Sequence, residues 1–238
     1  MNIEIIYQDK DLIAINKPSG LSVHGSLTPD KSKEKESTLV DFLLDKFPEV
    51  ALVGDDPVGR PGIVHRLDKN TSGVMVVARN QNAFLALKNL FQKRLVEKTY
   101  RAIVCGRVKK REGIISLPIG RLVNNPLKRG IEIGRSRIRG ARDAVTHYHV
   151  RRATDEFSLL LLMPKTGRMH QLRVHMKAIG HPIACDRVYG GKNVCCPENT
   201  LRSLLHAQSL SFSFPEGRRL YFEADLPEDF ALAEKRIF

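Results

Sequence analysis

Short apolar segments of strand length recur along this chain and constrain its fold more than any other feature. Each runs for about five to eight residues and is either alternating or continuously apolar, the pattern of half-buried or fully buried β-strands. The predicted strands span residues 3–7, 12–16, 74–78, 98–105, 145–150, 157–163, 209–214 and 219–224. Turn-forming sequences follow some of them, as at Pro18-Ser19-Gly20 and Pro215-Glu216-Gly217.

Only a few helices are predicted between these strands. They span residues 38–47, 80–95 and 171–179, where apolar side chains recur at helical spacing. Asn80 is a residue type that caps helix starts, and Pro48 and Gly180 end the first and third helices. Many strands with few helices are typical of an α+β fold with a mixed, largely antiparallel central sheet flanked by helices and loops. Because no linker interrupts the pattern, we expect residues 1–238 to form a single domain.

The charge balance points to a polyanionic partner. The chain contains 39 Lys+Arg against 26 Asp+Glu, a formal net charge of +13. Such an excess with clustered basic residues is typical of nucleic-acid-binding proteins. On charge alone, a basic soluble protein without a polyanion partner is the alternative. The longest apolar run, residues 159–163, is far shorter than the roughly 18 residues of a membrane span, so no membrane association is expected.

The N-terminus and the cysteines indicate a cytoplasmic protein. The start, Met1-Asn2-Ile3-Glu4, lacks the basic and long apolar regions of a signal peptide. The four cysteines are Cys105, Cys185, Cys195 and Cys196, and none forms the C-x-x-C pair of a zinc ribbon. Adjacent cysteines do not form an ordinary disulfide with each other. We therefore expect four reduced thiols.

One polar loop places a single carboxylate among basic residues. It reads His65-Arg66-Leu67-Asp68-Lys69-Asn70-Thr71-Ser72-Gly73 and precedes the predicted strand at 74–78. A loop carried by a rigid strand is a common support for a reactive group. Cations beside Asp68 offset the repulsion between its carboxylate and phosphates. This composition suits an acidic group that works next to a polyanion.

A second cluster lies at residues 164–175, where a buried-looking strand turns into a helix. It contains Arg168, His170, Gln171 and Arg173. Free amides at a helix start favour anions, and a guanidinium on the helix can form a bidentate pair with a carboxylate. From the residues alone, a catalytic role and a basic surface helix that only contacts phosphates are equally supported.

Two further segments are candidates for RNA contact. Residues 128–142 hold Arg135, Arg137, Arg139 and three other basic residues against one acid, with three glycines. We expect a flexible basic loop that moulds to a phosphate backbone, with a merely solvated loop as the alternative. Residues 29–37 are charged and low in complexity, which predicts a mobile surface loop.

Metal and nucleotide chemistry find little support in the sequence. His65, His170 and His175 are potential ligands, but no H-E-x-x-H pattern and no adjacent pair of carboxylates accompanies them. Ser72 lacks the G-x-S-x-G setting of a nucleophilic serine. The chain also contains neither G-x-x-x-x-G-K-[ST] nor G-x-G-x-x-G. We expect no metal and no cofactor.

The residue motifs, taken in order along the chain, resemble the RluA-type RNA pseudouridine synthases. The loop at 65–73 resembles the signature of that family, whose members isomerise uridine to pseudouridine in ribosomal or transfer RNA. The other resembling segments are Asn16-Lys17-Pro18-Ser19-Gly20-Leu21 with Val23-His24, Glu97-Lys98-Thr99-Tyr100-Arg101-Ala102, Thr166 to His175, Gly180-His181-Pro182-Ile183 with Asp186, and Leu204-Leu205-His206-Ala207. The resemblance implies the pseudouridine synthase fold, a cofactor-free reaction on RNA and a monomer without an obligate protein partner.

The resemblance also implies roles for individual residues. Asp68 matches the essential aspartate, which either attacks ribose C1′ or removes a proton from C2′. Arg173 matches the arginine that pairs with it, and Tyr100 matches the tyrosine that packs against the target base and assists proton removal at C5. The residues expected to contact RNA are Arg66, His65, Arg168, His170, Gln171, Arg135, Arg137 and Arg139.

The resemblance extends to domain organisation and to competing functions. Many family members carry a small RNA-binding domain before the catalytic domain. Because the first predicted strand begins at Ile3, we expect no such domain here.

Two alternative functions are considered. The first is a catalytically silent RNA-binding protein, which the intact Asp68, Tyr100 and Arg173 argue against. The second is a metal-dependent RNA hydrolase, which the lack of acidic clusters argues against.

Overall fold

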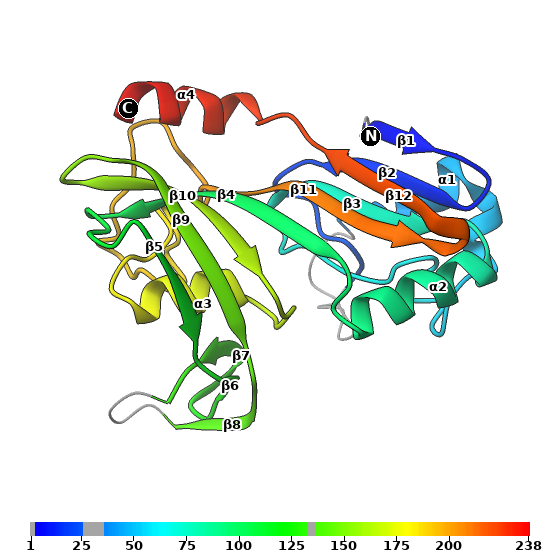
Figure 1. Ribbon diagram of the computed structural model, residues 1–238, viewed down its shortest axis with the longest axis horizontal. Helices are drawn as coiled ribbons and strands as arrows, with labels where there is room; N and C mark the ends of the chain where they lie inside the picture. The colour runs from blue at the N-terminus through cyan, green and yellow to red at the C-terminus, as the bar shows by residue number, and fades with distance from the viewer. Residues whose placement is uncertain (1–2, 26–35, 133–136) are drawn as a thin grey trace. The chain divides into compact units, whose positions relative to one another are not determined.

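The computed structural model describes residues 3–25, 36–132 and 137–238. The chain divides into two compact units: unit 1 contains Met1–Glu97 and Ala207–Asp225, and unit 2 contains Lys98–His206 and Leu226–Phe238 (Figure 1). Each unit combines antiparallel strands with helices, which confirms the predicted α+β class. The prediction of one domain over residues 1–238 stays a prediction.

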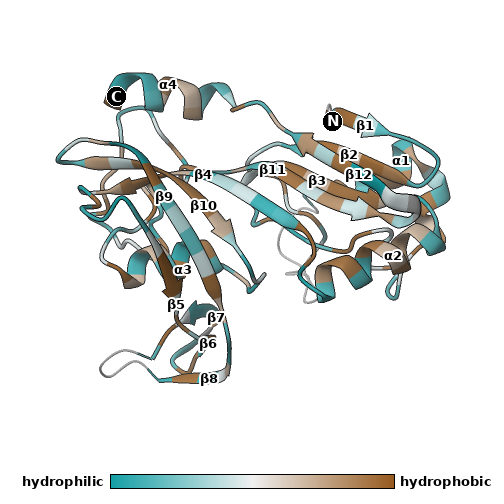
Figure 2. Ribbon diagram, in the orientation of Figure 1, coloured by the Kyte–Doolittle hydropathy of each residue, from teal (hydrophilic) through white to brown (hydrophobic). Residues whose placement is uncertain are grey.

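Unit 1 is built on antiparallel strands. β1 (Glu4–Gln8), β2 (Leu12–Lys17) and β3 (Ser72–Ala78) pair in succession, and β11 (Leu205–Phe214) pairs with β12 (Arg218–Glu223). All seven residues of β3 are buried. In Figure 2 β2 and β3 are mostly brown, as expected for strands inside a sheet with covered faces. The continuous apolar run that predicted β3 therefore reflects burial on both faces.

Two helices of unit 1 begin at capping residues. α2 (Gln81–Gln92) starts after Asn80, whose side chain accepts a hydrogen bond from the Ala83 amide at 2.9 Å. Its buried residues, including Phe84, join the core that β2, β3, β11 and β12 share. α1 (Leu39–Lys46) starts with a capping box between Thr38 and Asp41, and the 3-10 helix η1 (Pro48–Leu52) follows it. Both helix starts are confirmed.

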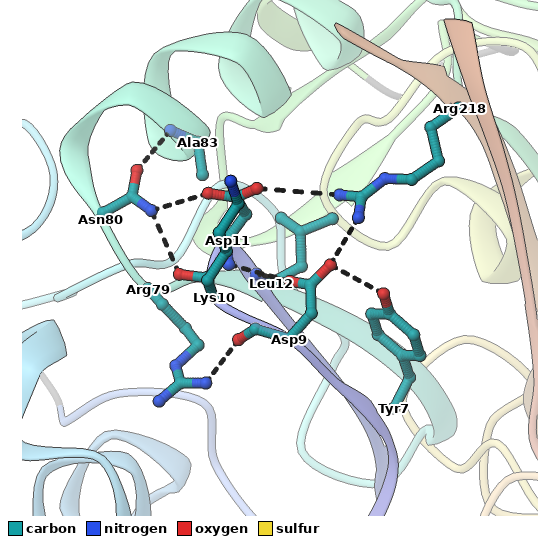
Figure 3. Close-up of polar contacts among 9 residues, drawn as sticks. All are labelled: Tyr7, Asp9, Lys10, Asp11, Leu12, Arg79, Asn80, Ala83 and Arg218. Carbon is teal, nitrogen blue, oxygen red and sulfur yellow. Dashed lines mark hydrogen bonds and ion pairs between the residues drawn. The ribbon is translucent and has the colours of Figure 1, made fainter. Parts of the chain in front are cut away.

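The turn between β1 and β2 is fixed by the Asp9 carboxylate (Figure 3). It accepts hydrogen bonds from the amides of Asp11 at 2.8 Å and Leu12 at 2.7 Å. The Tyr7 hydroxyl and the Arg218 guanidinium each donate to it at 2.7 Å. Burial raises the pKa of Asp9, but these hydrogen bonds outweigh it and lower the pKa to about 2.

The same turn holds the start of α2 in place. The Asn80 amide donates to the Asp11 carboxylate at 3.0 Å and to the Lys10 carbonyl at 3.2 Å, and Arg79 donates to the Asp9 carbonyl (Figure 3). Segments far apart in the sequence are thereby joined at one corner of unit 1, next to the end of β3.

Unit 2 contains a four-stranded antiparallel arrangement in the order β4-β10-β9-β5. The strands are β4 (Glu97–Cys105), which enters the unit at Lys98, β5 (Glu112–Ser116), β9 (Val145–Ala153) and β10 (Phe157–Pro164). Successive side chains of a strand point to opposite faces. In β4, Ala102 and Val104 belong to one core cluster and Ile103 to another.

A helix covers each face of these strands. α3 (Gln171–Ala178) contributes Leu172 and Met176 to the cluster of Ala102 and Val104, and α4 (Glu228–Ile237) contributes Phe230 to that of Ile103. Figure 1 shows the two helices apart from each other, with these strands between them. None of the described helices reaches the length and apolar character that crossing a membrane requires.

A small three-stranded sheet replaces much of the predicted basic loop. β6 (Ile119–Leu122) pairs with both β7 (Asn125–Gly130) and β8 (Ile138–Arg142), each time antiparallel. The prediction of a flexible loop over residues 128–142 is therefore wrong for its two ends. Arginine and glycine are poor strand signals on their own, and pairing with β6 overrides that preference. Arg135 and residues 29–35 of the predicted mobile loop lie outside the described residues.

The four cysteines form two disulfides, so the expectation of four reduced thiols is wrong. Cys105 pairs with Cys195, and Cys185 pairs with Cys196, with Cα–Cα distances of 5.6 and 4.6 Å. The two adjacent cysteines thus have different partners. Sequence spacing could not reveal this pairing, because the fold of unit 2 brings Cys105 of β4 to a segment 90 residues later.

Candidate active site

The Asp68 loop of unit 1 is held mainly through its backbone. The Thr71 amide donates to the Asp68 carbonyl at 3.0 Å, which closes a turn around the half-buried carboxylate. The Gly20 amide donates to the Lys69 carbonyl at 2.9 Å, and the Ser19 hydroxyl donates to the Asn70 carbonyl at 2.9 Å. Backbone hydrogen bonds therefore hold the loop on both sides of Asp68.

Lys17, at the end of β2, is the central support of this loop. Its side chain is 0% exposed, and its ammonium donates to the carbonyls of Pro18 at 2.8 Å, Leu21 at 2.9 Å and Lys69 at 3.1 Å. A buried charge is tolerated only when it is well hydrogen-bonded. Lys17 thus ties the segment after β2 to the Asp68 loop. In the sequence Lys17 stands out only as part of a family motif, because a lysine is ordinarily a solvated surface residue.

The residues on either side of Asp68 are also placed by specific contacts. The His65 ring accepts a hydrogen bond from the Val76 amide at 3.0 Å and stacks on Phe91 with centroids 4.6 Å apart. These contacts give His65 a structural role besides the RNA contact predicted for it. Arg66 is exposed, and its guanidinium lies 3.0 Å from the His24 ring nitrogen Nε2.

Glycine is required where the loop enters β3. Gly73 has φ of 117°, and a Cβ at this position would lie 2.1 Å from the Ala207 carbonyl oxygen. No other residue fits so close a backbone approach. The final residue of the polar motif is thus fixed by packing between neighbouring strands of unit 1.

Arg173, on α3 of unit 2, is held by a buried carboxylate. Its Nε and Nη2 donate to the two oxygens of Asp186 at 2.7 and 2.9 Å, a bidentate pair with side-chain exposures of 11% and 1%. Asp186 also accepts hydrogen bonds from the amides of Val188 and Tyr189. The pairing expected between Arg173 and Asp68 concerns residues of different units and stays a prediction.

Tyr189 connects Arg173 to the turn before α3. The guanidinium carbon of Arg173 lies 4.9 Å from the Tyr189 ring centroid, a cation–π contact. The Tyr189 hydroxyl lies 2.6 Å from His170 Nδ1 and accepts a hydrogen bond from the Arg129 amide at 3.1 Å. His170 has φ of 58°, in the left-handed region, so this turn needs such anchoring. The sequence carried no signal for Tyr189.

Gln171 supports the same turn from inside. It is 4% exposed; its oxygen accepts from the Thr166 hydroxyl at 2.7 Å and the Arg168 amide at 3.0 Å. Its amide nitrogen donates to Val145 and Thr146, each at 3.0 Å. All its hydrogen-bonding capacity is used inside the protein. These contacts give Gln171 a structural role, and its predicted contact with RNA stays a prediction.

Tyr100 and Arg168 are placed on the same unit. Tyr100 lies on β4 opposite Leu162 of β10 and is half-buried against the core cluster that includes Leu172 of α3. Arg168 is partly exposed and donates from Nε to the Asp143 carbonyl at 3.0 Å. Arg173, Tyr100 and the residues of the turn before α3 thus belong to one folded body.

His175, one of the three histidines considered as metal ligands, lies in the core of unit 2. His175 is 0% exposed, and its ring nitrogens lie 2.9 Å from the Thr146 hydroxyl and 3.0 Å from the Leu117 carbonyl. Burial lowers the pKa of His175, with the Leu117 contact opposing it. Among the described residues, no group of three or more His, Cys, Asp or Glu side chains is placed to hold a metal ion.

The remaining candidates lie in the small sheet. Arg139 on β8 is exposed and lies opposite Arg121 of β6, and Arg137 is exposed just before β8. Arg139 is thus presented to solvent on a strand, and Arg137 directly beside it. Their contact with RNA stays a prediction.

Comparisons with known proteins agree on one family. A family model described as RNA pseudouridylate synthase matches residues 11–178. The chain is 39% identical over 238 residues to the uncharacterized RNA pseudouridine synthase YlyB of Bacillus subtilis, covering 97% of this chain and 71% of the relative. It is 41% identical over 236 residues to an uncharacterized RNA pseudouridine synthase of Aquifex aeolicus, covering 96% and 71%.

A further relative and two solved structures are also similar to this chain. The ribosomal large subunit pseudouridine synthase D of Neisseria meningitidis serogroup B is 39% identical over 238 residues, with 96% of this chain and 59% of the relative covered. The fold is similar to that of human RNA pseudouridylate synthase domain containing 4, with a TM-score of 0.77, 28% identity and coverage of 98% and 92%. For human RNA pseudouridylate synthase domain containing 1 the TM-score is 0.75 at 28% identity, with 95% and 84% covered.

Proposed function

The chain belongs to the RNA pseudouridylate synthase family, and from that premise we propose that it converts specific uridines of structured ribosomal RNA to pseudouridine, with Asp68 as the catalytic carboxylate. It is an RNA pseudouridine synthase, an isomerase that acts on RNA. In this reaction the bond between C1′ and N1 of uridine breaks and a bond between C1′ and C5 forms. The proton leaving C5 is matched by one gained at N1, so no cofactor is consumed.

One observation carries the assignment of Asp68. Its loop is fixed by the buried ammonium of Lys17, which donates to three backbone carbonyls, among them that of Lys69. A catalytic group is effective when its support holds it in one orientation before substrate binds. This preorganisation supports a role for Asp68 at the ribose, either as a nucleophile at C1′ or as a base at C2′.

Tyr100 and Arg173 complete the proposed catalytic set. Tyr100 packs against the uracil and assists removal of the C5 proton, since a phenol offers both an aromatic face and a polar tip. Arg173 stabilises negative charge during the reaction, and its bidentate pair with Asp186 supports a fixed orientation. His65, Arg66, Arg168, His170, Arg137 and Arg139 are proposed as RNA-contacting residues.

Ribosomal RNA is the proposed substrate class, with transfer RNA as the alternative. The name of the Neisseria relative, a ribosomal large subunit enzyme, supports this choice. The glycosidic carbon is inaccessible in a stacked base, so the target uridine must be flipped out, which costs a few kcal/mol. The formal net charge of +13 favours phosphate contacts that offset this cost.

We further propose that the enzyme works in the cytoplasm as a monomer and needs neither a metal nor a protein partner. Disulfides are rare in a reducing cytosol. The localisation is therefore best tested by alkylating the thiols of protein trapped directly from cells. In the cytoplasm both disulfides are expected to be reduced and the four cysteines labelled, whereas protection of all four by the two disulfides would overturn the cytoplasmic localisation.

The central test follows pseudouridine directly. Purified protein is incubated in EDTA with large-subunit ribosomal RNA fragments and, separately, with transfer RNA, and pseudouridine is mapped chemically. Modification is expected in the ribosomal RNA despite EDTA. It should disappear in Asp68→Asn, which keeps the side chain's size, while RNA affinity stays within about twofold. Modification of transfer RNA only would overturn the substrate class. Strand cleavage, or full activity of Asp68→Asn, would overturn the role of the carboxylate.

The two proposed roles of Asp68 differ in whether the C2′–H bond of the ribose breaks. Removal of a proton from C2′ breaks a C–H bond, so uridine deuterated at C2′ should react several-fold more slowly under single-turnover conditions. Attack at C1′ leaves that bond intact and predicts only a small isotope effect. The measurement thus distinguishes a base from a nucleophile.

A further inference from the structure

Unit 2 contains an open cavity of about 310 Å³ whose walls are mostly cationic. Two apolar residues, Val150 and Leu159, line it beside five basic ones. The basic residues are Arg101, Arg111, His149, Arg151 and Arg152. They come from β4, from the segment just before β5 and from β9, so the cavity is built on the strands of the unit.

An irregularity in β9 concentrates the charge. Leu159 of β10 pairs with Arg152 whereas Leu160 pairs with Val150, so Arg151 is an extra residue in the strand. Such a bulge breaks the strict alternation of side chains and re-aims one of them. Because of it, two consecutive arginines line the same cavity.

The cavity lies on the face of the strands opposite to Tyr100. Arg101 follows Tyr100 directly in β4, and neighbouring residues of a strand point to opposite faces. Arg101 forms an ion pair at 2.5 Å with Glu234 of α4, the helix on that face. Tyr100 instead packs with the cluster that includes α3. A ligand in the cavity therefore does not compete for the proposed catalytic face of unit 2.

Three of the arginines have no carboxylate partner in the described part of the chain. Arg111, Arg151 and Arg152 are exposed, and no ion pair joins any of them to a described residue. Glu234 is occupied by Arg101, and Asp155, in the nearby β9–β10 turn, pairs with Arg107 at 3.0 Å. Glu112 lies opposite His149 in the strand register. The cavity thus keeps an excess of positive charge.

We propose that this cavity binds a phosphate of the RNA backbone, at a position remote from the uridine that is isomerised. Guanidinium groups present donors in a planar fork that matches phosphate oxygens. A phosphodiester is the anion that an RNA-modifying enzyme meets at high local concentration. The inference rests on the proposed RNA substrate and adds a second contact region to it.

The test is RNA binding by the full-length triple variant Arg111→Gln/Arg151→Gln/Arg152→Gln at several salt concentrations. Each phosphate contact contributes about 0.7 to 0.9 to the slope of log K against log salt. We expect the slope to fall by about one unit and the Kd at low salt to rise about tenfold. The lysine triple variant should recover most of the slope, because the charge is kept.

A matched control removes the same charge elsewhere. Arg60 and Arg219 of unit 1 are exposed and Lys88 is partly exposed; they pair with Asp56, Glu97 and Asp55, and their glutamine triple variant should keep the slope within experimental error. An unchanged slope in the cavity variant, or an equal loss in the control, would overturn the proposal, as would binding of an acidic protein with RNA affinity intact. Because the readout is binding, its failure is separate from a failure of Asp68-dependent isomerisation.

Discussion

The Asp68 loop and the Arg173 region position their key side chains by different means. The loop in unit 1 is held through its backbone, where the buried Lys17 binds the Lys69 carbonyl together with the carbonyls of Pro18 and Leu21 in the neighbouring segment. In unit 2, Arg173 is held through side chains, by the carboxylate of Asp186 and the ring of Tyr189. A loop held through its backbone depends on the donors that bind its carbonyls, which here are Lys17, the Gly20 amide and the Ser19 hydroxyl. A side-chain-held guanidinium depends on several partners, each of which contributes less.

The largest effect is expected for Lys17→Met, which keeps the length of the side chain and removes its ammonium. Three backbone carbonyls lose their donor, and each unsatisfied buried polar group costs about 1–3 kcal/mol. The free energy of unfolding should fall by about 3 kcal/mol or more, measured by urea denaturation. Lys88→Met, which removes an exposed ion pair with Asp55, should change it by less than about 1 kcal/mol. Equal effects of the two changes would refute the central role of Lys17.

Asp186→Asn should have the next largest effect and should act mainly on catalysis. Asparagine keeps one acceptor oxygen, so the loss of stability is about 2 kcal/mol, less than the roughly 3–5 kcal/mol of removing a buried partner. Misplacement of Arg173 should lower kcat about 100-fold. Asp229→Asn is the control, because Asp229 forms a similar bidentate pair with Arg202 in unit 2. A fall in kcat in both variants would show a merely structural effect.

A smaller effect is expected for Tyr189→Phe. The ring that stacks on Arg173 is kept, and the hydroxyl contacts with His170 and the Arg129 amide are lost. Stability should fall by about 1 kcal/mol, with a several-fold lower rate of pseudouridine formation. Tyr221→Phe removes an exposed hydroxyl that bonds to Glu223 and should leave the rate unchanged. A rate for Tyr189→Phe equal to that of the unsubstituted enzyme would remove the hydroxyl from the support of Arg173.

The smallest expected effect is a difference in the pH at which acid destabilises the two units. Burial holds the pKa of His175 below its usual 6.5, so its contribution to unit 2 is present above pH 6.5 and is lost as the pH falls through the lower folded pKa. Asp9 in unit 1 has a folded pKa of about 2 against 3.8, so its contribution is present above pH 3.8 and is lost progressively as the pH falls to about 2. Peptide-resolved hydrogen exchange should show unit 2 loosening at the higher pH. Loss of protection in both units at one pH would contradict this order.

Local patterns in the sequence predicted most of the strands and helix starts, because these depend on neighbouring residues. The helix α4 was missed, although Phe230, Ala233 and Ile237 recur at helical spacing. β5 was missed because its short stretch contains Gly113 and carries exposed residues. Long-range contacts were beyond reach: neither the burial of Lys17 nor the choice of Asp186 as the partner of Arg173 leaves a local trace in the sequence.

The family motifs placed the candidate residues, but contacts decided what several of them do. Gln171 is part of a motif suited to RNA contact, yet four internal hydrogen bonds bury it. His65 stacks inside unit 1 on Phe91. A motif reports which residue types occur together, whereas the direction in which each side chain points is set by the fold around it.

The two disulfides make the stability of unit 2 depend on oxidation. The bond between Cys105 and Cys195 closes a ring with a sequence separation of 90, and both Arg173 and Asp186 lie within it. A ring of this size restricts the unfolded chain and contributes an entropic stabilisation of about 4–5 kcal/mol. The stability of the fold around the Arg173–Asp186 pair therefore depends on whether the surroundings keep this disulfide oxidised. Oxidised and reduced protein with the same folded contacts would lose the pair at different denaturant concentrations.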